Sequence, residues 1–162
     1  MRRIRLLSSV FATGLCLAAA PASAVGQTAA PPAISQRSFT GGSAKVKVTG
    51  AFAIDEEIAI NTKASYGDGV MTWLQFGASG AAEANSLITY GETGETGVNV
   101  AKGKMTAVAG IMPGEKSECS GKVEVTETLV TGDYTCVGVT SYDPATFSMS
   151  KVDIKVRFTA KS

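Results

Sequence analysis

The sequence predicts an all-β fold, an antiparallel β-sandwich with a small antiparallel β-barrel as the alternative. Apolar and polar residues alternate along many segments, and Gly-rich turns separate these segments at intervals of about eight to twelve residues. No stretch shows the periodicity of an amphipathic helix. We expect about nine or ten short strands, and a sandwich rather than a barrel because several strands are apolar on one face only.

The clearest strand lies near the C-terminus, in the segment 151–158. Its apolar residues share one face and its charged residues share the other, the pattern of a strand between core and solvent. The apolar set is Val152, Ile154, Val156 and Phe158, and the charged set is Lys151, Asp153, Lys155 and Arg157.

The first 24 residues have the features of a secretory signal peptide. Three arginines precede a short apolar run over 6–20, and Ala22-Ser23-Ala24 places small residues before a cleavage site. We expect cleavage after about Ala24 and a secreted or periplasmic protein. No other apolar run is long enough to cross a bilayer as a helix.

Two further regions follow the predicted signal peptide. Residues 25–43 are rich in Pro, Gly, Ser and Ala and are expected to form a flexible N-terminal segment. Residues 44–162 are expected to form a single β domain, which is long enough for a core of its own.

Within this domain the alternating segments follow one another in order. The predicted strands cover 44–54, 58–62, 70–76, 86–90, 98–100, 105–112, 122–129, 134–140 and 151–158. The acidic residues 55–57 are expected at a hairpin turn. Thr131-Gly132-Asp133 is expected to form another, because glycine and aspartate favour turns.

Cys119 and Cys136 are the two cysteines outside the predicted leader, and the protein contains no histidine. An exported chain with two cysteines favours a disulfide between them over two free thiols or a metal site. The bond should stabilise the fold by about 3 kcal/mol through the entropy of the closed loop. With a turn at 131–133, Cys136 would lie opposite about residue 127, so the bond would join an entry loop to a neighbouring strand.

The charge distribution argues against a nucleic-acid ligand. Of the 15 Lys and Arg residues three lie in the predicted leader, so 12 remain against 14 Asp and Glu. The lysines are spread through the predicted strands and mixed with acids, whereas binding to a phosphate backbone requires clustered positive charge.

The sequence also argues against an enzyme. Without histidine there is no usual base at neutral pH, and no serine stands in a Gly-x-Ser-x-Gly motif. We therefore expect no catalytic residues, no cofactor and no metal. A pair of carboxylates, Glu92 with Glu95, is the remaining possibility for a hydrolase, but a glycine-rich loop holds two such groups poorly at a fixed separation.

That loop, Gly91–Gly97, repeats the triplet Gly-Glu-Thr and is the most unusual loop of the chain. Loops at one end of a β-domain commonly carry binding residues. The predicted binding loop therefore consists of Glu92, Thr93, Glu95 and Thr96. Two carboxylates and two hydroxyls supply too few oxygens for calcium.

The leading hypothesis is a secreted or periplasmic binding module whose partner is an unknown protein, glycan or lipid. The alternative is a structural or surface-assembly protein that polymerises through edge strands, which requires an exposed, uncharged strand edge. A carboxylate-based hydrolase is the third hypothesis.

Overall fold

The structure, a computed structural model, describes residues 36–78, 82–91, 94–112 and 117–162. Within these ranges the fold consists of eleven β-strands. They are β1 (Gln36–Ser38), β2 (Gly41–Gly50), β3 (Ile54–Ala59), β4 (Tyr66–Asp68), β5 (Met71–Phe76), β6 (Ala84–Gly91), β7 (Thr96–Lys102), β8 (Met105–Ile111), β9 (Cys119–Val125), β10 (Leu129–Asp143) and β11 (Ser148–Lys161). All belong to one unit, Pro31–Ser162. No helix in these ranges is long and apolar enough to cross a membrane.

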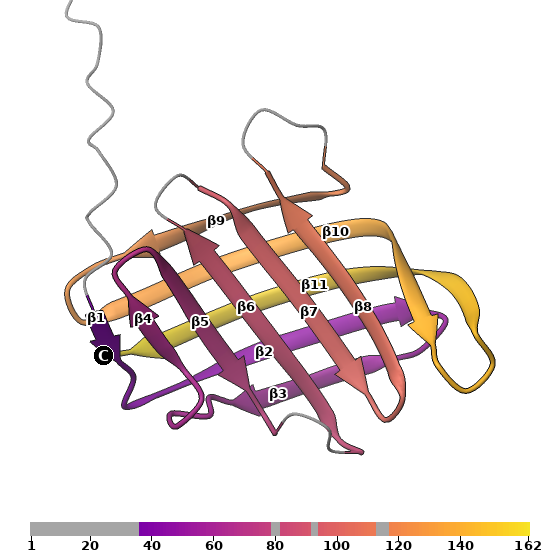
Figure 1. Cartoon of the computed structure of the whole chain (residues 1–162), viewed down its shortest axis with the longest axis horizontal. Coiled ribbons are helices and arrows are strands. Elements are labelled where there is room, and N and C mark those ends of the chain that lie inside the picture. The colour runs from indigo at the N-terminus through magenta and orange to yellow at the C-terminus, as the bar shows by residue number, and fades with distance from the viewer. Residues whose placement is uncertain (1–35, 79–81, 92–93, 113–116) are drawn as a thin grey trace, which may run out of the picture. The chain divides into compact units, whose positions relative to one another are not determined.

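All eleven strands join in one antiparallel sheet. Its order is β1-β4-β5-β6-β7-β8-β10-β11-β2-β3, and β9 pairs with β10 beside this path. The sheet curls into a half-barrel with two limbs that cross each other (Figure 1). We call them the β10–β11 limb, which contains β9, β10, β11, β2 and β3, and the β5–β8 limb, which contains β4 to β8.

The two limbs meet at both sides of the sheet. On one side β8 pairs with the end of β10, Ala107 opposite Ser141. On the other side the chain after β3 reaches the end of β5, where Ile60 forms a bridge with Phe76 and the Gly77 N–H donates to the Ala59 carbonyl at 2.9 Å. The curl encloses the core between the limbs.

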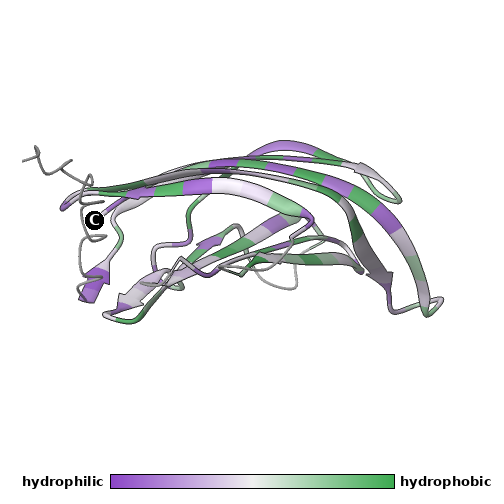
Figure 2. Ribbon diagram, turned by 90° about the horizontal axis from the view of Figure 1, so that it is seen from above, coloured by the Kyte–Doolittle hydropathy of each residue, from purple (hydrophilic) through white to green (hydrophobic). Residues whose placement is uncertain are grey.

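The core consists of the apolar residues that alternate with polar residues along the strands. Along β11 the four apolar residues from Val152 to Phe158 are at most 2% exposed, while the charged residues between them are exposed. Figure 2 shows the same alternation of hydrophobic and hydrophilic residues along the long strands. The prediction of an all-β antiparallel fold with one disulfide is therefore confirmed.

Strand structure begins earlier than expected. β1 and the first three residues of β2 fall within 25–43, the range assigned from sequence to a flexible segment. β1 pairs with β4, and Phe39 beyond it is only 3% exposed. Residues 1–35, and with them the predicted signal peptide, lie outside the described residues.

The sequence favoured a sandwich of two sheets, but the fold is one continuous sheet. The course of β10 explains this difference. Its first part pairs with β9 and its last residues pair with β8. A β-bulge lies between Cys136 and Val139, where Gly138 has a φ of 69°. A bulge bends its strand and increases the twist, so β10 passes from one limb into the other without ending.

The predicted turn at Thr131–Asp133 is wrong, because these residues lie inside β10. The chain turns between β9 and β10 instead, with Val125 opposite Val130. A glycine is needed at position 132 because the ring of Phe158 packs against it, not because the chain turns there. A Cβ at this position would lie 2.6 Å from that ring. Cys119 consequently lies directly opposite Cys136 on the neighbouring strand, with their Cα atoms 4.0 Å apart.

Candidate functional site

The predicted binding loop is only partly described, since Glu92 and Thr93 lie outside the described residues. Glu95 accepts a hydrogen bond from the Gly91 N–H through its backbone carbonyl at 2.8 Å. Thr96 starts β7, and its hydroxyl oxygen is buried. The structure therefore turns Thr96 inward, away from any surface formed by Glu95. The loop stays a prediction, as does the carboxylate pair Glu92 and Glu95.

A row of polar residues crosses the inner face of the β5–β8 limb at its β1 end. Thr72 lies opposite Tyr90, and Tyr90 lies opposite Thr96. Arg37 on β1 joins the same row and donates to the Thr126 carbonyl at 2.6 Å, which ties β1 to the turn between β9 and β10. Tyr134 enters this region from β10 and is 2% exposed.

Burial decides the ionisation of the two tyrosines of this row. Burial raises the pKa of Tyr90, and the hydroxyl of Thr72 and the charge of Arg37 oppose the rise. Burial likewise raises the pKa of Tyr134 from 10.0 to about 12, although the Thr96 hydroxyl opposes it. Both side chains are therefore neutral, polar elements of the interior at physiological pH.

This shift predicts a loss of stability at alkaline pH. An unfolded tyrosine ionises near pH 10, whereas Tyr134 in the folded state stays protonated up to about pH 12. Its contribution is complete below pH 10 and is lost as the pH rises toward 12, by roughly 2 kcal/mol. Denaturant titrations between pH 8 and 12 should show this fall, and Tyr134→Phe should flatten it. Tyr66→Phe, at a tyrosine 51% exposed, is the control; equal slopes in both variants would contradict the prediction.

The outer face of the β10–β11 limb carries a cluster of four cationic side chains, which we call the basic strip. Lys45 and Lys47 come from β2, and Lys155 and Arg157 come from β11. Lys45 lies opposite Arg157 and Lys47 lies opposite Lys155 in the antiparallel register. Side chains in such pairs start only about 5 Å apart at their Cβ atoms, so two like-charged pairs occupy adjacent positions.

Acidic residues flank the basic strip, but only one of them forms an ion pair with it among the described residues. All four residues are exposed. Lys47 pairs with Asp55 of β3 at 3.7 Å, but among the described residues the other three form no ion pair within 4.0 Å. Acidic residues border the strip on both sides, with Asp133 opposite Arg157 on β10 and Glu57 opposite Lys45 on β3.

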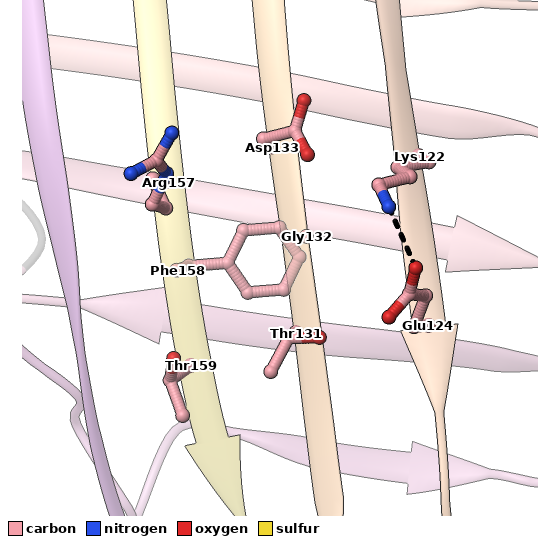
Figure 3. A pocket seen from close by; sticks show the side chains of 8 residues that line it. All are labelled: Lys122, Glu124, Thr131, Gly132, Asp133, Arg157, Phe158 and Thr159. Atoms are coloured by element: carbon pink, nitrogen blue, oxygen red, sulfur yellow. Dashed lines mark hydrogen bonds and ion pairs between the residues drawn. The ribbon is translucent and has the colours of Figure 1, made fainter.

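The basic strip lines a shallow depression of about 250 Å³, together with Asp133 and Thr135. A second depression of about 280 Å³ adjoins it over β9, β10 and β11 and shares Arg157 and Asp133 (Figure 3). Lys122 lies at its far side, paired with Glu124 at 2.7 Å. Arg157 thus lies between two open depressions on one face.

The basic strip is not evident from the sequence, because its β2 pair and its β11 pair are more than a hundred residues apart. The pattern Lys-x-Lys on one strand and Lys-x-Arg on the other was visible. Only the pairing of β2 with β11 places the two patterns side by side, and neither the pairing of strands so far apart nor their register can be read from alternation alone. The expectation that the lysines are spread apart is therefore wrong for this face, whereas the expectation that acids lie among them is confirmed there.

Among the described residues, no three Asp, Glu or Cys side chains come together in a group that could hold a metal ion. No protein-family model, curated protein or solved structure matches the chain. Function is therefore inferred from the geometry of the surface itself.

Proposed function

We propose that this protein is an exported binding module that contacts an anionic partner with the basic strip. The observation that carries the proposal is the placement of Lys45 opposite Arg157 and of Lys47 opposite Lys155. Like charges directly opposite each other on neighbouring strands destabilise a sheet. Asp55, Glu57 and Asp133 on the flanking strands offset part of this charge, and an anion outside the fold would compensate the rest.

The form of the surface indicates the chemistry of the partner. The depression over the strip is open and shallow, and its lining consists of charged and polar side chains with Tyr134 and Val156 below them. No aromatic ring among its lining residues is exposed for stacking on a sugar. Recognition would rest on charge and hydrogen bonding to carboxylate, sulfate or phosphate groups repeated along a polymer or a surface.

Replacing all four strip residues by glutamine is expected to abolish this binding. Each Lys or Arg near an anionic surface contributes about 1 kcal/mol, so loss of all four should lower the affinity on the order of 1,000-fold. Binding of the domain would be measured on immobilised dextran sulfate, on polygalacturonate and on phosphatidylglycerol vesicles, at two salt concentrations. The three probes separate sulfate, carboxylate and phosphate partners.

A matched control replaces four other exposed or half-buried lysines by glutamine: Lys63, Lys102, Lys104 and Lys151. The control has the same net charge as the strip variant but an intact strip. The strip variant alone should lose binding, and its free energy of unfolding should stay equal or rise, by up to about 1 kcal/mol. Equal loss in both variants, or no binding to any probe, would refute the proposal.

A further inference from the structure

Five buried polar atoms without a hydrogen-bond partner gather inside the half-barrel. They are Arg37 Nε and the hydroxyl oxygens of Thr72, Tyr90, Thr96 and Tyr134, and we call these five residues the inner cluster. Thr72, Tyr90 and Tyr134 are 0%, 3% and 2% exposed. Buried polar groups in folded proteins nearly always have a hydrogen-bond partner, so five unpartnered ones in one region require an explanation.

The strand register places four members of the inner cluster in one row. Arg37 lies opposite Gly67, and Gly67 lies opposite Thr72. The row continues through Tyr90 to Thr96 on the next two strands. Residues directly opposite each other on neighbouring strands share a face of the sheet, and the burial of Thr72 and Tyr90 shows that this is the inner face.

Tyr134 reaches the same row from β10. Burial raises its pKa, and the nearby Thr96 hydroxyl opposes this rise. Burial also raises the pKa of Tyr90, where the Thr72 hydroxyl and then the charge of Arg37 oppose the rise. The hydroxyls of each pair are therefore neighbours, but they lack the geometry of a hydrogen bond.

The inner cluster consists of hydrogen-bond donors and one positive charge. Arg37 forms no ion pair within 4.0 Å in the described ranges of the chain. Its Nη1 donates to the Thr126 carbonyl at 2.6 Å, which leaves the Nε–H to donate elsewhere, and each of the four hydroxyls can also donate. The charge of Asp133 acts on Tyr134, but Asp133 is exposed on the outer face.

We propose that the inner cluster binds the carboxylate group of a small organic acid. A carboxylate only accepts hydrogen bonds and has about four sites for them, which suits a set of five donors. Its single negative charge equals the single positive charge of Arg37. A doubly charged phosphate or sulfate would leave one buried charge without compensation, which is costly.

The fold also offers room and a way in for such a group. Gly67 has no side chain, so no side chain stands in the row between Arg37 and Thr72. These two residues lie two strand spacings apart, about 10 Å at the backbone. Arg37 is half-buried, so a small acid can reach the inner cluster from the β1 side. The basic strip lies on the outer face, and this site is independent of it.

The test is an NMR titration of the whole protein with sodium acetate as the probe. The amide signals of Arg37, Thr72 and Tyr90 should shift and reach saturation, whereas sodium chloride at the same ionic strength should not shift them. Sodium phosphate and sodium sulfate are titrated in parallel. Tighter binding of either of these two anions at the same amides would overturn the assignment to a carboxylate.

Tyr90→Phe and Thr72→Val each remove one hydroxyl with little change of volume and should weaken acetate at least about tenfold. Arg37→Gln removes the charge and should abolish the saturable shifts. Ser86→Ala is the matched control. The Ser86 hydroxyl is also buried without a partner and shares the inner face of β6, but it lies about 13 Å from Tyr90 along the strand, so its loss should leave the affinity unchanged.

Stability without acetate separates binding from a purely structural role. Because the Tyr90 hydroxyl has no partner in the fold, Tyr90→Phe should be at least as stable as the original protein. Lower stability with unchanged affinity would show that the hydroxyls bond to one another and would overturn the proposal. Absence of saturable shifts, or equal weakening by Ser86→Ala, would also overturn it. The variant with glutamine at all four strip positions should bind acetate unchanged, so this proposal and the proposed function can fail separately.

Discussion

Phe158→Ala is expected to lower the free energy of unfolding by about 3–5 kcal/mol, the usual cost of deleting a buried aromatic ring. Phe158 is 1% exposed. Its ring lies 6.1 Å from the ring of Phe76 on the β5–β8 limb and 6.1 Å from the ring of Tyr134 on β10. Because the ring contacts both limbs, the cavity left by alanine would open where the half-barrel is held together. Chemical denaturation with a fluorescence or circular-dichroism signal measures the loss.

Two further variants show whether the ring itself is responsible. Phe158→Leu keeps an apolar side chain and should cost less than alanine. Gly132→Ala should cost about 1–3 kcal/mol by overpacking, because its Cβ would lie 2.6 Å from the Phe158 ring and 2.8 Å from the Lys122 carbonyl oxygen. In the Phe158→Leu background this cost should shrink. Strictly additive effects would show that the ring does not occupy the space beside Gly132.

Removing the disulfide with Cys119→Ala and Cys136→Ala is expected to cost about 3 kcal/mol, since it releases a loop whose ends are 17 residues apart. Cys119 lies on β9, and among the described strands β9 pairs with β10 alone, so this bond is the one covalent link that holds β9 to its partner. Hydrogen exchange of β9 should therefore accelerate more than exchange of β11. Denaturant unfolding gives the global change.

The pair Ser120→Ala and Thr135→Ala is the control for this prediction. These residues lie opposite each other one position further along β9 and β10, but no covalent bond joins them. Their double variant should change the free energy of unfolding by less than about 1 kcal/mol. A variant without the disulfide that is as stable as the control would contradict the prediction.

Alternation was sufficient to predict which residues of β2 and β11 face the core, because side chains on a strand alternate between the two faces. Val46, Val48 and Ile154 are buried as expected. The glycines were harder to interpret from sequence. Gly132 suggested a turn, but it is small because Phe158 packs against it, and this error displaced the expected partner of Cys136.

The candidate site, like the fold, could be predicted only in part from the sequence. The predicted loop contributes Glu95 at most to the described surface, whereas Lys45, Lys47, Lys155 and Arg157 form a cluster that composition did not indicate. The bend of β10, which lets this strand pair first with β9 and then with β8, was equally hidden. Gly138 marks that bend in the sequence, but a glycine alone does not tell a bulge from a turn.

Three features could be predicted from the residues alone: the class of the fold, the inward face of the principal strands and the two cysteines that form the disulfide. These are local properties, set by alternation within a strand and by the small number of cysteines. That β2 lies beside β11 and that β8 leaves β10 after Ala107 became evident only in the folded protein. Both depend on which strands pair and in what register, and pairing between distant strands is chosen by the packing of the whole core.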